Sequence, residues 1–356
     1  MLGGERRYRR NIRAGLSKAF RNAGEIPFDA DREKLIVFSD LHKGSRDGAD
    51  DFWRCERAYH AALGYYLEQG HTLYALGDVE ELWECNPEEV LKEYPGTFAL
   101  EAEFHQRGRY RRFWGNHDDL WSRPDQVGKH LSPFYGEGLQ PLEAIKLRAS
   151  FAGAEAGTIF FVHGHQGTLF SDRHRTVGRL VVHHLWRPLQ RTFKWSSTTP
   201  ATDSHLRGKH DTAMYEWARD HDERPVLIAG HTHHPVFWND WKKRIAEERE
   251  RIEELRCAWR PRPGKLARAR ATFEYNRATW RWPGPPPRTI ESPCYFNTGC
   301  CAFGDGDVTG IEIAEGEIRL VRWPDDSDRP RPKVLASATL SEVLERVAGA
   351  TAPAAS

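Results

Sequence analysis

The chain has 356 residues, a formal net charge of +1 and 29% charged residues, which is an ordinary composition for a globular protein. This length is enough to bury a full core in one large α/β domain or two modest ones. A net charge near zero predicts no nucleic-acid partner, and no apolar run approaches the roughly 20 residues that span a membrane. The six cysteines form no C-x-x-C pair and no signal peptide is expected, so we expect reduced thiols in a cytoplasmic protein.

Residues 1–33 are expected to form a basic extension ahead of the main domain. Its first 21 residues contain Arg6, Arg7, Arg9, Arg10, Arg13, Lys18 and Arg21. Ile12, Leu16 and Phe20 recur every four residues, a spacing typical of one face of a helix. Two interpretations stay open: peripheral contact of a basic amphipathic helix with an anionic membrane, or a basic tail that aids solubility.

Buried strands alternate with helices over the next part of the chain. Residues 34–40 form a short apolar, β-branched run that predicts a buried strand, and residues 50–69 carry apolar positions at helical spacing. Residues 71–78 and 111–118 repeat the apolar run that ends in a polar turn, and a helix is expected after Pro87. This alternation predicts βαβ units and a mainly parallel sheet in an α/β fold.

The pattern resumes in the second half of the chain. Residues 144–148 and 158–163 predict adjacent strands, and residues 225–231 predict another buried strand. Between them, residues 168–207 are expected to be helical and basic. Residues 241–290 have the features of an insertion, which begins as a charge-rich helix and ends in a stretch rich in Pro, Arg and Trp. The insertion is either a cap that grips a substrate over the site or an excursion packed on the outside.

The chain is expected to close with a β-hairpin. Residues 308–313 and 317–322 are two apolar runs on either side of a short turn. The main domain is therefore expected to cover residues 34–325. The Ala- and Pro-containing tail, residues 326–356, is expected to be partly disordered.

Each predicted buried strand ends in a small group of His, Asp or Asn side chains. In chain order, the candidate metal ligands among them are Asp40, His42, Asp78, Asn116, His163, His231 and His233. Ligands collect at the carboxyl ends of strands in open α/β sheets, so these residues are predicted to converge on one site. Imidazole, carboxylate and one amide, without thiolate, suit Mn, Fe, Zn or similar divalent ions. Seven ligands exceed one tetrahedral site and fit two ions, with Asp78 as the natural bridge.

This ligand set indicates phosphoryl chemistry. Two divalent ions about 3.5–4 Å apart can clamp the attacking and leaving oxygens of an in-line displacement. A hydroxide held between the metals would be the nucleophile, because bound water loses its proton near neutral pH. The sequence therefore predicts a hydrolase of phosphoester or pyrophosphate bonds.

The ordered motifs resemble those of the calcineurin-like metallophosphoesterase superfamily, from about Lys34 to Arg322. The resemblance implies a β-sandwich flanked by helices, in α/β-β/α layers, and two divalent ions, with Mn²⁺ expected first and Fe, Zn or Mg as alternatives. It implies one metal set of Asp40, His42, Asp78 and His233, and another of Asp78, Asn116, His163 and His231. It places His117 beside the phosphate as a general acid or transition-state stabiliser, which suits imidazole near pH 7. Asp118 is expected to orient His117.

The segment after Asp78 resembles one branch of the superfamily, the UDP-2,3-diacylglucosamine pyrophosphatases. Leu82 and Trp83 carry this likeness, and the basic segment after His163 adds to it. The chain departs from the branch at His117, where an Arg is usual, and at His165, where an Asp is usual. We therefore expect a small-molecule or lipid-linked phosphate substrate, such as a nucleotide-sugar or lipid pyrophosphate, without fixing which one.

Several alternatives stay open at this point. A phosphoprotein or cyclic-nucleotide hydrolase fits the same ligands, because specificity resides in loops and in the insertion. A non-catalytic scaffold on the same fold is disfavoured because every motif position is kept. His165 is either a phosphate contact, a partner of a ligand, or a loop histidine. Glu81 is expected to have a structural role at a helix start, and His234 a turn position. The oligomeric state is not predicted.

Overall fold

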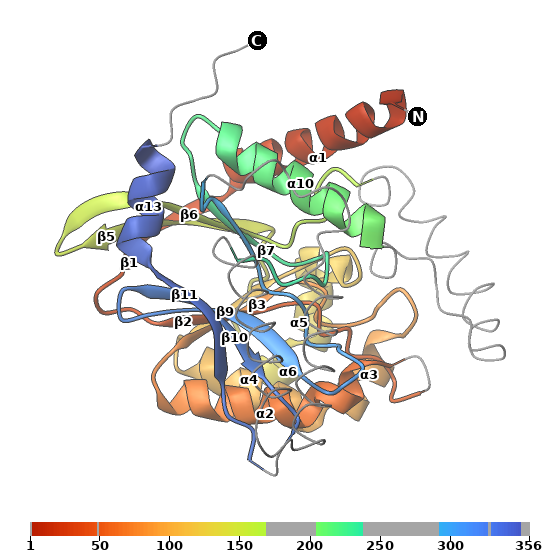
Figure 1. The fold of residues 1–356 in the computed structure, drawn as a ribbon. Helices are drawn as coiled ribbons and strands as arrows, with labels where there is room; N and C mark the ends of the chain where they lie inside the picture. Colours follow the sequence, from red (N-terminus) through yellow and green to blue (C-terminus); the bar gives the residue numbers. More distant parts are fainter. Residues whose placement is uncertain (1, 48–49, 169–203, 238–291, 327–328, 350–356) are drawn as a thin grey trace, which may run out of the picture.

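A computed structural model describes residues 2–47, 50–168, 204–237, 292–326 and 329–349. Two β-sheets pack face to face in the middle of the molecule, and helices cover both outer sides (Figure 1). This arrangement confirms the expected α/β class with a β-sandwich flanked by helices. The expected insertion at residues 241–290, and all but the ends of the expected basic helix at 168–207, lie outside the described residues.

The six-stranded sheet has the order β11-β10-β9-β2-β3-β4. Its strands are β2 (Leu35–Phe38), β3 (Thr72–Leu76), β4 (Tyr110–Phe113), β9 (Val308–Ala314), β10 (Glu317–Trp323) and β11 (Lys333–Thr339). The pairs β2·β3 and β3·β4 are parallel, whereas β2·β9, β9·β10 and β10·β11 are antiparallel. The predicted hairpin is therefore confirmed as β9 and β10.

The five-stranded sheet has the order β1-β5-β6-β7-β8. Its strands are β1 (Gly24–Asp29), β5 (Ala144–Phe151), β6 (Ala154–Val162), β7 (Val226–Ala229) and β8 (Tyr295–Asn297). The neighbours β5 and β6 pair antiparallel, and the other three pairs are parallel. The five-stranded sheet is thus mainly parallel, as expected, whereas the six-stranded sheet is mixed. The short turns between β5 and β6 and between β9 and β10 reverse the chain and make these pairs antiparallel.

Alternation along β2 shows why a continuous apolar run forms a strand here. Leu35 and Val37 belong to the core between the sheets, while Ile36 and Phe38 belong to the core under the helices. Successive side chains of a strand point to opposite faces, so a strand covered on both sides must be apolar at every position.

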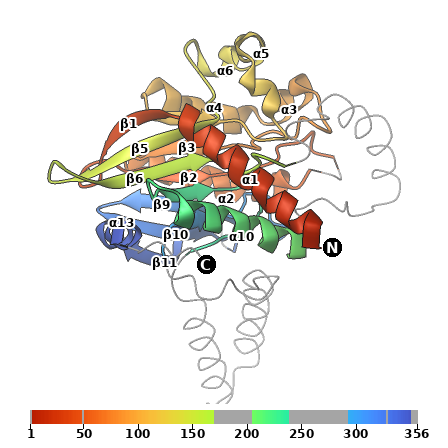
Figure 2. The same ribbon diagram turned by 90° about the horizontal axis from the view of Figure 1, so that it is seen from above.

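Helices cover the two outer faces of the sandwich (Figures 1 and 2). The outer face of the six-stranded sheet is covered by α2 (Phe52–Glu68), α3 (Pro87–Glu93), α4 (Pro95–Gln106), η1 (Asp119–Ser122), α5 (Pro124–His130) and α6 (Ser132–Tyr135). The other side is covered by α1 (Leu2–Asn22), α10 (Ser204–Asp220) and α13 (Leu340–Gly349). The helix predicted at residues 50–69 is confirmed as α2, and the helix predicted after Pro87 is confirmed as α3.

The N-terminal segment is part of the domain, which corrects the expected boundary after residue 33. β1 pairs with β5 as the edge strand of the five-stranded sheet, and α1 packs beside α10 (Figure 2). Ile12, Leu16 and Phe20 lie on one face of the helix, as their spacing predicts, and each is at most 2% exposed in the core. Membrane contact of α1 would therefore have to use its basic face alone, because its apolar face is covered by protein.

The C-terminal segment is also ordered beyond the expected domain end at 325. β11 extends the six-stranded sheet at its edge, and α13 buries Leu340, Val343 and Leu344 against strands of both sheets, chiefly β6. The expected disordered tail is thereby corrected for residues 329–349, while residues 350–356 lie outside the described residues. No helix among the described residues is long and apolar enough to cross a membrane.

Candidate metal centre

The predicted ligands lie in loops that begin where the central strands end. Five of them have a left-handed backbone: φ is +54° at Asp40, +50° at His42, +51° at Asp78, +69° at His231 and +55° at His233. A residue with a Cβ loses roughly 1–2 kcal/mol in this conformation. Such residues gather at functional sites, where the surrounding structure holds them in place. The sharp turns direct five side chains from three loops toward one point.

Backbone hydrogen bonds join the first two ligand loops beyond the ends of β2 and β3. The amide of Asp40 donates to Gly77 O at 3.1 Å, and the amide of His42 donates to Asp78 O at 2.9 Å. Glycine is required where the loops approach each other most closely. A Cβ at Gly115 would collide with the Asp78 carboxylate, and a Cβ at Gly230 would collide with that of Asp40.

One group of ligands consists of Asp40, His42 and His233. Asp40 Oδ1 lies 3.2 Å from His233 Nε2 and 3.9 Å from His42 Nε2, and the two imidazole Nε2 atoms are 3.0 Å apart. The backbone amide of His231 donates to both oxygens of Asp40, which fixes the carboxylate in the site.

A second group consists of Asp78, His163 and His231. His163 Nε2 lies 3.0 Å from Asp78 Oδ2, and the rings of His163 and His231 are 5.3 Å apart. The two groups adjoin, because Asp78 Oδ2 is also 3.9 Å from His42 Nε2 and Asp40 Oδ1 is 4.0 Å from His163 Nε2. Asp78 therefore lies between the two groups, where a bridging ligand is expected.

Asn116 stands next to this second group. The residue before it, Gly115, abuts the Asp78 carboxylate, and the amide of His117 donates to Asp78 Oδ1 at 2.8 Å. Asn116 Oδ1 is buried and accepts no hydrogen bond from the described residues. Leaving a buried carbonyl oxygen unpaired costs about 1–3 kcal/mol, so this atom fits a metal ligand better than a structural amide.

The hydrogen bonds of His42 and His163 show which ring nitrogen of each is available to a cation. His163 Nδ1 donates to Leu76 O at 2.8 Å, and His42 Nδ1 donates to Glu81 Oε2 at 2.9 Å, since neither oxygen can donate. Each Nε2 then directs its lone pair toward Asp40 and Asp78 unless it carries a second proton. Negative side chains raise the pKa of His42 to about 10 and that of His163 to about 9, although burial opposes both shifts. A divalent cation between these lone pairs and carboxylates would replace those protons, so the donor set fits a metal.

His117 lies beside the ligands and is held by Glu81 and Trp83. Its Nδ1 donates to Glu81 Oε1 at 2.8 Å, and its ring stacks on Trp83 with centroids 4.1 Å apart. Burial lowers the pKa of His117, but Glu81 and Asp78 outweigh it and the net shift is upward. Burial raises the pKa of Glu81, yet His117 and His42 bring it down to about 2. His117 is thus held as a proton donor next to the ligand groups.

Asp118 does not orient His117, which corrects its expected role. Its carboxylate accepts backbone N–H groups from Gly115 at 2.6 Å, Asp78 at 3.2 Å and Val79 at 2.9 Å. Burial and the nearby Asp78 raise the pKa of Asp118 to about 7. Asp118 therefore ties the loop after β3 to the loop after β4 and touches no reacting group.

Glu81 takes the role that the sequence assigned to Asp118. It contacts both His42 and His117, and it lies in a turn rather than at the expected helix start. The signal that could have revealed it is an acid three residues after a ligand aspartate, where one turn of chain returns the side chain to the site. His165 lies under the site, with its ring 5.5 Å from His163 and 5.4 Å from Trp114. His234 is buried behind the ligand loop, with Nδ1 3.4 Å from Asp211 Oδ2.

Beneath the ligand loops lies a fully buried group of charges, which we call the support cluster: Lys43, Glu80, Glu101 and Arg112. Lys43 Nζ lies 3.2 Å from both Glu80 and Glu101, and Arg112 pairs with Glu80. All four side chains are 0% exposed. Lys43 directly follows the ligand His42, and Glu80 directly precedes Glu81. The support cluster therefore anchors the loops that carry ligands of both groups.

Comparisons with known proteins agree with this geometry. A model of the calcineurin-like phosphoesterase family matches residues 33–235, and no curated protein matches the chain. Among solved structures, a conserved uncharacterized protein from Streptococcus pneumoniae TIGR4, described as a predicted phosphoesterase, is 12% identical. That alignment covers 85% of this chain and 97% of the other, but its TM-score of 0.30 is too low to support an argument. The family match contains all seven predicted ligands and more than half of the sequence, so the chain belongs to the calcineurin-like phosphoesterase family.

Proposed function

We propose that this phosphoric ester hydrolase uses two divalent metal ions to cleave a pyrophosphate or phosphodiester bond by in-line displacement. The observation that carries the proposal is the pair of adjoining ligand groups, with Asp78 between them and His117 at their edge. Asp40, His42, Asp78 and His233 would hold one ion, and Asp78, Asn116, His163 and His231 the other. When bound, the ions would supply an activated water and neutralise charge on the phosphate. Mn²⁺ is the first ion to test, because the ligands are imidazole and oxygen without thiolate.

The protein's own residues would handle the leaving group. His117 Nδ1 donates to Glu81, which also holds the proposed ligand His42. Its Nε2 is then the atom that donates a hydrogen bond or a proton to the oxygen that leaves. General acid catalysis of this kind contributes typically 10²–10⁴-fold. Glu81 positions His117 and His42 together, so the proton donor and one ligand histidine keep a fixed relation.

The residues around His117 support a substrate whose leaving oxygen gains a proton as it departs. An alkoxide leaving group needs that proton in mono- and diesters alike, and His117 is placed to supply it, so the diester or pyrophosphate preference rests on the likeness given below. Trp83 stacks on the other side of the imidazole and fixes the ring plane. The likeness of Leu82 and Trp83 to the UDP-2,3-diacylglucosamine pyrophosphatases favours a nucleotide-sugar or lipid-linked pyrophosphate. A phosphoprotein or cyclic-nucleotide substrate is the alternative.

A substrate panel with Mn²⁺ tests the proposal. The panel contains bis-p-nitrophenyl phosphate, p-nitrophenyl phosphate, cyclic AMP and a UDP-sugar pyrophosphate, each assayed with and without chelator. We expect chelator-sensitive turnover, with kcat/KM higher for the diester or pyrophosphate than for the monoester. Turnover that is unaffected by chelator would refute the metal requirement. A clear preference for the monoester would refute the assigned substrate class and favour a phosphatase.

A further inference from the structure

His210 and Tyr8 connect the N-terminal helix to the loops that carry two proposed ligands. His210, in α10, is only 3% exposed. Its Nε2 lies 2.7 Å from Gly164 O, the carbonyl that directly follows His163, and its ring centroid lies 4.9 Å from that of His231. Tyr8, in α1, places its hydroxyl 2.8 Å from His210 Nδ1. The contact thus runs from α1 through α10 to two of the three loops of the second group, those of His163 and His231.

The hydrogen bonds fix which atom carries each proton. Gly164 O can only accept, so His210 Nε2 carries the hydrogen and donates it. With Nε2 donating to Gly164 O, Nδ1 of the neutral imidazole has a free lone pair and accepts from the Tyr8 hydroxyl at 2.8 Å. Burial, with a smaller contribution from Asp211, raises the pKa of Tyr8 to about 12, so the phenol keeps its proton. The imidazole is therefore locked in one tautomer and one orientation.

The backbone of α1 also presses on the loop that follows His163. A Cβ at Gly15 would lie 2.5 Å from Gly167 N, and a Cβ at Gly167, where φ is +79°, would collide with Asn11 O. Only glycine at both positions permits this approach. Gln166 completes the contact, because its Oε1 accepts the Gly164 amide at 3.1 Å. α1 therefore packs directly against the loop that follows His163. This helix lies outside the family match, which begins at residue 33.

We propose that Tyr8 and His210 are positioning residues for the metal centre, which set the loop of His163 and the ring of His231. Neither residue touches a reacting group. The proposal rests on the proposed function, in that His163 and His231 hold a metal ion. Partners that orient ligating groups typically change metal affinity or activity 10–100-fold when they are removed. The N-terminal helix would thus be required for metal binding and not only for the stability of the fold.

The test measures Mn²⁺ binding directly, by titrating the purified full-length protein and detecting free Mn²⁺ by electron paramagnetic resonance. We expect His210→Leu to weaken Mn²⁺ binding about 10–100-fold. His210→Gln should recover most of that loss, because its amide N–H can donate to Gly164 O. Tyr8→Phe removes one oxygen and should weaken binding a few-fold. If His210→Leu does not fold, Tyr8→Phe keeps the test decisive.

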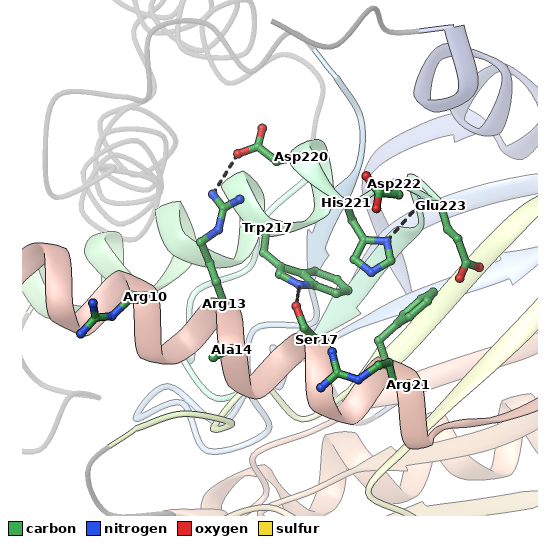
Figure 3. Close-up of a pocket in the computed structure, with 11 residues that line it drawn as sticks. Arg10, Arg13, Ala14, Ser17, Arg21, Trp217, Asp220, His221, Asp222 and Glu223 are labelled. Atoms are coloured by element: carbon green, nitrogen blue, oxygen red, sulfur yellow. Dashed lines mark hydrogen bonds and ion pairs between the residues drawn. The ribbon is translucent and has the colours of Figure 1, made fainter. Parts of the chain in front are cut away.

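Ser17→Ala is the matched control at the same helix pair. Ser17 Oγ accepts the Trp217 Nε1–H at 2.9 Å in the hollow between α1 and α10 (Figure 3). Ser17 lies more than two helical turns after Tyr8 in α1. We expect this variant to lower the melting temperature about as much as Tyr8→Phe while leaving Mn²⁺ affinity and kcat/KM unchanged. Equal loss of affinity in Ser17→Ala and Tyr8→Phe would show a general effect of helix packing and overturn the proposal.

The outcomes separate this proposal from the proposed function. A wild-type protein that binds no divalent ion would overturn both. A wild-type protein that binds Mn²⁺, together with a folded His210→Leu variant of equal affinity and equal kcat/KM, would overturn the positioning role alone.

Discussion

Two buried polar clusters lie one above the other at the strand ends, and they differ in how their charges are balanced. In the support cluster, two cations face two carboxylates: Lys43 and Arg112 pair with Glu80 and Glu101. In the metal centre, the partners of Asp40 and Asp78 are histidines. Lys and Arg keep their charge in the first cluster, whereas a metal ion can replace the protons of histidines in the second. We therefore expect the support cluster to stabilise the fold and the metal centre to carry out the reaction.

The largest contrast is expected between Asp78→Ala and Arg112→Met. Asp78→Ala should abolish metal binding and turnover but leave the metal-free protein folded, because it removes one of two adjacent carboxylates. Arg112→Met leaves Glu80 and Glu101 with one cation and should cost about 3–5 kcal/mol of unfolding free energy. Urea unfolding in chelator, together with Mn²⁺ titration, measures both effects. A turnover-competent Asp78→Ala variant would refute the assignment of Asp78 as the shared ligand.

His117→Ala should separate chemistry from metal binding within the metal centre. We expect turnover of a diester to fall about 10²–10⁴-fold while Mn²⁺ affinity changes little, because His117 belongs to neither of the two proposed ligand sets. Steady-state kinetics and metal titration on the same sample measure this. The loss should be smaller for a substrate whose leaving group needs no proton, such as p-nitrophenolate, than for an alkyl or sugar leaving group. An equal loss for both would argue against the general-acid role.

Glu81→Gln should give a smaller loss that affects two functions together. The substitution keeps the size of the side chain but removes the negative charge that faces His42 and His117. We expect turnover and Mn²⁺ affinity each to fall about 10–100-fold. Asp118→Asn is the informative comparison, because its carboxylate accepts only backbone N–H groups at short range. That variant should lower stability more than it lowers kcat/KM, and the reverse result would restore the catalytic role that the sequence suggested.

The smallest effect is expected in the pH dependence of stability. Without metal, His42 and His163 have pKa values raised to about 10 and about 9. A raised folded pKa contributes stability that is complete below the unfolded pKa of about 6.5 and is lost as pH rises through the folded pKa. The chelated protein should therefore lose stability between about pH 6.5 and pH 10. Burial lowers the pKa of His231 and His233, so these two residues stabilise the fold above the unfolded pKa, and that stability is lost as the pH falls below it.

Added Mn²⁺ should make stability rise with pH instead of fall, because the ion binds the deprotonated imidazoles. Melting temperatures measured across this pH range, with chelator and with Mn²⁺, test the prediction. Arg112→Met should lower both curves without changing their slopes. Identical slopes with and without Mn²⁺ in the wild-type protein would contradict the coupling between protons and metal.

The sequence by itself predicted much of the fold and most of the metal centre. Apolar runs such as residues 34–40 identified the central strands, because a strand covered on both faces has no polar positions. The polar residues at the end of each run predicted side chains that the structure brings together, because the carboxyl ends of such strands meet at one edge. All of these signals are local in the chain, and a single sequence displays them.

The tertiary structure decided what depends on contacts between distant residues. Asp118 and Glu81 are both acids near the site, and only the turn after Asp78 places Glu81, rather than Asp118, against His117. α1 shows the basic, amphipathic pattern of a surface helix, yet its apolar face packs into the core and Tyr8 reaches His210 across 202 positions of sequence. The local sequence of residues 329–349 predicts a tail, but in the structure β11 pairs with β10. In each case the local pattern was compatible with two environments, and burial against a distant segment selected one of them.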